Sequence, residues 1–92
     1  MTVYIDPPTW PGHGLLWSHL VSDLSYAELH AFAHRLGVSR RAFERDHYDI
    51  PGHRYADAVR AGAVEVSSRE VVVLLHGAGL RRRKRAAQRR SS

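Results

Sequence analysis

The stretch that decides the fold is residues 15–36, LLWSHLVSDLSYAELHAFAHRL, because it joins a strand pattern to a helix pattern without a break. Its first eight residues include several that favour strands, and they alternate between two faces. Trp17, His19 and Val21 share one of these faces, while the intervening leucines and serines share the other. We therefore expect a strand that carries a histidine on one face of a sheet.

A helix follows this strand almost at once, and both of its ends are marked. Ser25 and Glu28 have the spacing of a capping box, in which each side chain satisfies a free backbone N–H at the helix start. Gly37 can adopt the left-handed conformation that ends many helices. The apolar residues at helical spacing between these signals are Leu29, Phe32, Ala33 and Leu36. The segment predicts an amphipathic helix that buries this stripe.

The flanking segments predict further short elements. They are a strand over residues 3–5, a proline- and glycine-rich loop over 7–14, a short helix over 39–45, a connection or strand over 47–50, a helix over 51–61, a strand over 63–66 and a helix over 67–76. Helices between strands indicate a small single α/β domain over residues 1–80. We expect a short mixed sheet of three to four strands, with three to four helices packed mainly on one face.

Composition limits the class of protein. The 92 residues suffice for one domain with a modest core. The absence of cysteine excludes disulfides, thiolate metal sites and cysteine nucleophiles, and it fits the reducing cytoplasm. No apolar run approaches the roughly 20 residues that a membrane helix needs, and the first residues lack the pattern of a signal peptide. We expect a cytoplasmic protein with no membrane contact.

The net charge of +5 comes from the C-terminal end of the chain. Residues 81–92 hold seven of the 14 lysines and arginines and no acidic residue, which leaves residues 1–80 with a net charge of −2. This arginine-rich tail has no apolar stripe, so we expect it to be disordered. It could contact nucleic-acid phosphates, although nothing in it reads bases, and it could equally be a solubilising extension.

Histidine and aspartate residues cluster at the expected strand ends. His19 and Asp23 flank the end of the central strand, and His47 and Asp49 lie two residues apart, on the same side if the chain is extended. If these ends meet, the four side chains form a candidate catalytic centre. His19, His47 and Asp49, with Asp6 as a further carboxylate, could bind a divalent metal such as Zn, Mn or Fe.

Two other readings of the same residues remain open. A histidine oriented by an aspartate could act as a general base without metal. Alternatively, Asp23 caps a turn, Asp49 caps the next helix, and the cluster has only a structural role.

Ligand-binding candidates surround this centre. The expected helix start at Pro51 offers free backbone N–H groups, and Arg54 adds a charge that suits a phosphate or carboxylate. Trp17 and Tyr48 could form the walls of a pocket, and His13 lies in an accessible loop. Arg54 could instead pair with Asp57 or Asp49 on the surface.

The chain resembles a family of small bacterial and phage domains, domain-of-unknown-function family 4031. The matching segments are Val3-Tyr4-Ile5-Asp6, Trp17-Ser18-His19 through Asp23, Glu28 to Ala33 with Leu36-Gly37, Phe43, His47-Tyr48-Asp49, Arg54, Ala58 and Gly62-Ala63. The resemblance covers about residues 2 to 75, and the arginine-rich tail lies outside it. Family members often carry Leu-Thr-Pro after His-Tyr-Asp, whereas this chain has Ile50-Pro51. The resemblance implies the domain and no particular activity.

Three functions fit the sequence. The first is a small, hydrolase-like or ligand-binding domain for a phosphorylated or nucleotide-like molecule, with a divalent metal as a candidate cofactor. The second is a nucleic-acid-associated accessory protein that uses residues 81–92. The third is a structural or interaction module without catalysis.

Overall fold

The strand expected over residues 15–22 forms the centre of the sheet. The computed structural model describes residues 2–82, and in it β3 (Leu15–Ser22) has neighbours on both sides. The other strands are β1 (Val3–Ile5), β2 (Trp10–Gly12), β4 (Phe43–Glu44), β5 (His47–Pro51) and β6 (Val64–Glu65). The order is β4-β5-β3-β1-β6, with β2 paired to β3, and only the β1–β6 pairing is parallel. The expected mixed sheet is therefore present.

The expected number of three to four strands was too low, because the described chain forms a six-stranded sheet. β2 was missed because it contains a proline and a glycine, which favour a loop until the facing strand is known. β4 has two residues, too few to show a period, and it lies within the segment expected to be a short helix. Only a 3-10 turn, Arg40–Ala42, forms there.

Residues 2–82 form three α-helices, and the capping signals of α1 and α3 were predicted correctly. α1 (Tyr26–Leu36) begins at Ser25, whose side chain accepts a hydrogen bond from the Glu28 amide, and ends at Gly37 with φ 82°. α3 (Ser68–Gly77) is capped in the same way by Ser67. The helix expected from Pro51 starts later, because Gly52–Arg54 forms a 3-10 turn before α2 (Tyr55–Arg60).

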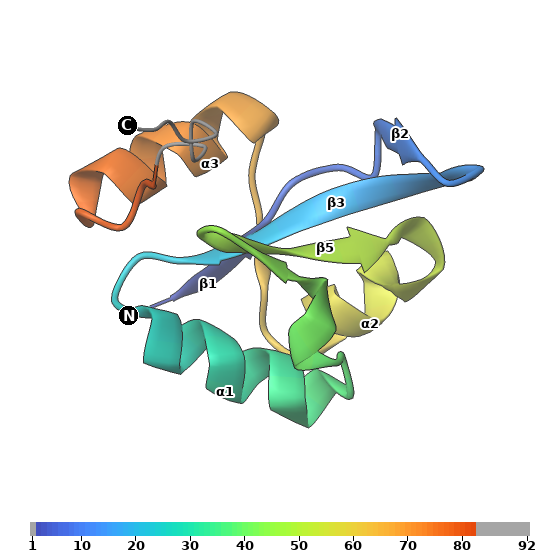
Figure 1. The fold of residues 1–92 in the computed structure, drawn as a ribbon, viewed down its shortest axis with the longest axis horizontal. Coiled ribbons are helices and arrows are strands. Elements are labelled where there is room, and N and C mark those ends of the chain that lie inside the picture. Colours follow the sequence, from blue (N-terminus) through green and yellow to red (C-terminus); the bar gives the residue numbers. More distant parts are fainter. Residues whose placement is uncertain (1, 83–92) are drawn as a thin grey trace, which may run out of the picture.

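The helices cover the two faces of the sheet unequally. α1 and α2 lie against one face and α3 lies on the other (Figure 1). Under α1 and α2 the chain buries its larger core, which includes Ile5, Leu20 and Tyr48. Under α3 the core is small, with Val21, Val71 and Leu75 at its centre. The α3 face therefore has room for polar side chains.

The described residues contain no helix with both the length and the apolar character needed to cross a membrane.

A hydroxyl network joins the end of β3 to α1, and it can be tested. Ser22 accepts hydrogen bonds from the amides of Leu24 and Ser25, and it donates one to Glu28. Ser22→Ala should lower the free energy of unfolding by about 1–3 kcal/mol, because it leaves buried groups without partners. Urea denaturation measures this loss.

Ser18 is the matched control, since it is equally buried on the same strand. Within residues 2–82 its hydroxyl has no hydrogen-bond partner. Ser18→Ala should leave stability unchanged or raise it, because no bond is lost. Equal losses in the two variants would contradict this assignment.

Candidate functional site

Two histidines and one aspartate converge on the α3 face of the sheet. His19 on β3 lies opposite Asp49 on β5 in the antiparallel register, and His47 is two residues earlier on β5. One ligating atom from each of the three lies within 4.8 Å of the others. The rings of His19 and His47 are edge-on, with centroids 4.9 Å apart. We call His19, His47 and Asp49 the three-donor cluster.

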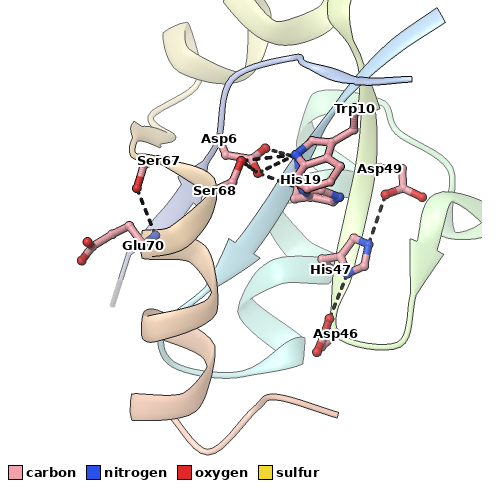
Figure 2. A network of polar contacts seen from close by, with 9 residues as sticks. All are labelled: Asp6, Trp10, His19, Asp46, His47, Asp49, Ser67, Ser68 and Glu70. Carbon is pink, nitrogen blue, oxygen red and sulfur yellow. Dashed lines mark hydrogen bonds and ion pairs between the residues drawn. The ribbon is translucent and has the colours of Figure 1, made fainter. Parts of the chain in front are cut away.

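A buried carboxylate holds His19 from behind (Figure 2). Asp6, fully buried at the end of β1, lies 2.9 Å from His19 Nδ1 and accepts a hydrogen bond of 2.6 Å from the His19 amide. Ser68 at the start of α3 donates to it at 2.8 Å, and Trp10 Nε1 donates at 3.3 Å. Burial alone would raise the pKa of Asp6, but the hydrogen bonds from His19 and Ser68 outweigh burial and lower it. Asp6 is therefore held as a carboxylate.

A second buried carboxylate holds His47 in the same way. Asp46 Oδ1 lies 2.8 Å from His47 Nδ1, and its Oδ2 accepts a hydrogen bond of 3.0 Å from the Arg82 amide. Asp49 Oδ1 approaches His47 Nε2 at 3.1 Å. Burial alone would lower the pKa of His47, but the hydrogen bonds and charges of Asp49 and Asp46 raise it. Without a metal, His47 favours its protonated form.

One nitrogen of each histidine does not face the buried carboxylate behind it, and in His47 this nitrogen pairs with Asp49, itself a member of the cluster, at 3.1 Å. Because Nδ1 of His19 and of His47 faces a buried carboxylate, Nε2 is the remaining ligand atom in both rings. Two imidazole nitrogens and a carboxylate suit Zn, Mn or Fe. In metal sites, the ring nitrogen of a histidine ligand that does not bind the metal usually forms a hydrogen bond to a carboxylate, as Nδ1 of both histidines does here.

Two members of the three-donor cluster, His19 and Asp49, border an open cavity of about 750 Å³, which we call the large cavity. Its lining also includes Trp10, Trp17, His13 and Arg41. Trp17 is fixed there by a 2.8 Å hydrogen bond from its Nε1 to the Gly12 carbonyl. Aromatic walls, one arginine and two of the three donors therefore face a single space.

Three of the expected site residues, Asp23, Tyr48 and Arg54, lie away from the three-donor cluster. Asp23 binds the Thr2 amide at 2.8 Å and the Tyr4 hydroxyl at 3.0 Å, at the opposite end of β1 from Asp6. Tyr48 is buried under α1, with its hydroxyl 2.7 Å from His30 Nδ1.

Arg54 is used within the fold. It donates to Asp57 at 2.8 Å and to the Leu36 carbonyl at 2.6 Å. The backbone N–H groups expected at the start of a helix from Pro51 lie in the 3-10 turn Gly52–Arg54, because α2 begins only at Tyr55. Arg41, not Arg54, is the arginine that lines the large cavity.

Sequence reasoning missed four residues of the site: Trp10, Arg41, Asp46 and Ser68. Asp46 carried a usable signal, because it directly precedes His47 in the run Asp46-His47-Tyr48-Asp49. The other three lie on β2, in the 3-10 turn Arg40–Ala42 and at the start of α3, and only the tertiary structure brings them to His19. Part of the expected tail is placed as well: Arg81 and Arg82 contact Asp46, whereas residues 83–92 lie outside the described residues.

The family assignment rests on the sequence. A family model described as protein of unknown function (DUF4031) matches residues 3–78, so the chain belongs to this family. The resemblance drawn from the sequence is thereby confirmed. Neither the curated proteins nor the solved structures yielded a match.

The pairing of His47 with two carboxylates predicts a pH-dependent contribution to stability. Because the pKa of His47 is raised above its ordinary 6.5 in the folded protein, this contribution is present below pH 6.5. It is lost as the pH rises through the folded pKa. His47→Gln should therefore reduce the free energy of unfolding more at pH 5.5 than at pH 9, in urea denaturation with a chelator present.

The control is His34→Gln, at an exposed position of α1. Its effect should be small at both pH values. An equal loss at the two pH values for His47→Gln would show that the charge pairing does not act as described.

Proposed function

We propose that this protein binds a divalent metal ion through His19, His47 and Asp49 and acts, in a hydrolase-like reaction, on a phosphorylated or nucleotide-like molecule held in the large cavity. The observation that carries the proposal is the pair of buried carboxylates, Asp6 and Asp46, each at the Nδ1 of one histidine. Burying two carboxylates is costly for a small domain unless strong partners are present. Their placement is explained if they fix the imidazole rings for a ligand on the other side.

Exposure also supports a metal-binding role. Asp49 has a side chain that is 42% exposed, and that of His19 is 24% exposed, so an ion could reach them from solvent. Three protein ligands leave coordination positions for water or substrate, as in catalytic zinc sites. This openness favours a catalytic centre over a closed structural one.

The walls of the large cavity favour an anion that carries a planar group. Arg41 offers a guanidinium that suits phosphate oxygens, and His13 adds a further nitrogen at the rim. Trp10 and Trp17 offer ring faces on which a base can stack. The charged and aromatic groups together support a nucleotide-like ligand.

A metal at this position would supply hydroxide at neutral pH, because a bound ion such as zinc lowers the pKa of water to about 7. In hydrolysis the oxygen of the attacking water would form a bond to phosphorus while the bond to the leaving oxygen breaks, and the proton lost by the water would go to the leaving oxygen. In this route His19 would hold the ion through Nε2, and Asp6 at its Nδ1 would keep the ring oriented.

A metal-free route has one specific observation in its favour. The 2.9 Å pairing of Asp6 with His19 is the arrangement that orients a histidine general base. Hydrolysis of bis(p-nitrophenyl) phosphate, measured before and after chelation, separates the two routes. Activity that survives chelation favours the general base, and activity restored by added metal favours the proposal.

Metal binding provides the direct test. Isothermal titration of chelator-treated protein with Zn²⁺ and Mn²⁺ should give one site per chain. Asp49→Asn and His19→Ala should each weaken it by more than the 10–100-fold that is typical of outer-shell changes. His34→Ala, which removes an exposed histidine from α1, should leave the affinity unchanged.

Asp49→Asn is the more informative of the two variants, because this half-exposed side chain is not part of the core. Circular dichroism should show that it folds normally. A wild-type protein that binds neither ion, or one whose site is insensitive to both variants, would overturn the proposal.

The supporting carboxylates give a further prediction. Asp46→Asn should lower metal affinity about 10–100-fold, because the amide no longer favours the His47 tautomer that presents Nε2. Asp57→Asn is the control, since Asp57 pairs with Arg54 and Arg60 on α2. Titration calorimetry measures both, with thermal unfolding as a check on folding. An unchanged affinity in Asp46→Asn would remove Asp46 from the site.

A further inference from the structure

A second hollow also borders the His19 ring. This small cavity has a volume of about 280 Å³, and its lining includes His19, His47, Arg45, Arg81, Ser68 and further residues of α3. It shares Trp10 and His19 with the large cavity, so the two are adjacent. His19 and Asp49 border the large cavity and His19 and His47 the small one, so the three-donor cluster joins two hollows.

Each hollow carries positive charge. Arg41 borders the large cavity, and Arg45 and Arg81 border the small one. Arg81 is partly balanced by Asp46, whose carboxylate lies 3.6 Å away, but its side chain remains 34% exposed. A ligand that reaches from one hollow to the other therefore meets an arginine on both sides of the cluster.

Arg45 combines an unusual backbone angle with a side-chain N–H that has no hydrogen-bond partner within residues 2–82. It has a positive φ of 56°, which a residue with a side chain rarely adopts. Its Nε is buried and, within residues 2–82, has no hydrogen-bond partner, since the Glu44 carboxylate is 4.0 Å away. A buried guanidinium N–H without an acceptor is costly. The Arg45 side chain as a whole is 32% exposed and borders the small cavity, where its charge suits a phosphate group.

The basic segment of the sequence begins at the small cavity. Arg81 borders the cavity and the Arg82 amide binds Asp46 beside it. The sequence then adds Arg83, Lys84, Arg85, Arg89 and Arg90. The sequence therefore supplies further positive charge directly after the residues that border the small cavity.

From these observations we infer that the ligand is a single-stranded nucleic acid that crosses the three-donor cluster. Its phosphates contact Arg41 on one side and Arg45 and Arg81 on the other, and bases stack on Trp10 and Trp17. This inference rests on the proposed function, since it places one phosphodiester at the proposed metal. Basic grooves with aromatic platforms are the usual way to bind single strands without reading sequence. An acidic peptide would use the arginines but not the exposed indoles.

The test is binding of a fluorescein-labelled 12-nucleotide oligo(dT) to the full chain, followed by anisotropy in chelator and again with Mn²⁺. Thymidine monophosphate should compete at least tenfold more weakly than unlabelled oligo(dT). Arg41→Ala and Arg45→Asn should each weaken binding about fivefold or more and reduce the salt slope of log K by about 0.7, the value for one phosphate contact. Asparagine is chosen at position 45 because it tolerates positive φ.

Two controls separate oligo(dT) binding at the two hollows from binding elsewhere on the chain. Arg35→Ala removes an exposed arginine from α1, on the opposite face of the sheet, and should leave affinity and salt slope unchanged. A full-length variant with serine at positions 83, 84, 85, 89 and 90 should bind more weakly but keep its dependence on Arg41. Both tryptophans border the large cavity, so oligo(dT) should also quench the intrinsic fluorescence of this variant.

Each alternative result is informative. Binding that disappears in the five-serine variant and ignores Arg41 and Arg45 would overturn the inference, because the basic segment alone would explain it. Equal competition by polyglutamate would overturn it in favour of an acidic peptide. Zn²⁺ or Mn²⁺ binding without any arginine-dependent oligo(dT) binding would overturn this inference and leave the proposed function standing. Arginine-dependent oligo(dT) binding by a protein that takes up no metal would uphold the nucleic-acid path across the three-donor cluster and overturn the proposed metal site.

Discussion

The carboxylate of Asp6 is the interaction on which the rest of the structure depends. It receives hydrogen bonds from the β3 backbone at His19, from Trp10 on β2 and from Ser68 on α3, and it faces the His19 ring (Figure 2). Three separate elements are thus tied to one point at the end of β1. Because the carboxylate is fully buried, losing any of these donors would leave part of its charge uncompensated.

This constraint also explains why α3 packs as it does. The apolar contact beneath α3 is small, so the helix relies on its first turn, where Ser68 reaches Asp6. The opposite face is different, because α1 and α2 cover a continuous apolar core there. One face of the sheet therefore gives the domain most of its stability, and the other can hold charged and aromatic groups beside solvent.

The sequence predicted the elements whose signals are local. The central strand formed over the expected residues, and Ser25, Gly37 and Ser67 ended or began helices where their chemistry requires. The short strands β2 and β4 were not predicted, because segments of two or three residues show no period of their own. Each is defined only by its pairing with the next strand, β3 or β5.

Most site residues follow the same rule, because those with a local sequence signal were predicted and those placed by tertiary contacts were not. His47 and Asp49 share a face because side chains on a strand alternate with a period of two, and that was visible in the sequence. Asp23 was placed with His19 by proximity in sequence, but four residues of extended chain cover about 13 Å. It consequently sits at the far end of β1, where it binds Thr2 and Tyr4. Arg41, Trp10 and Ser68 reach the cluster only through tertiary contacts.

The hydrogen bond from the Arg82 amide to Asp46 extends the candidate site beyond the family match. The family match stops at residue 78, yet the backbone group that steadies the carboxylate behind His47 comes four residues later. The boundary that the family pattern defines and the boundary that the chemistry needs are therefore different. A fragment cut at the family boundary would keep every candidate metal ligand and lose a support of one of them. Such a fragment would contain His19, His47 and Asp49, but Asp46 would orient His47 less firmly.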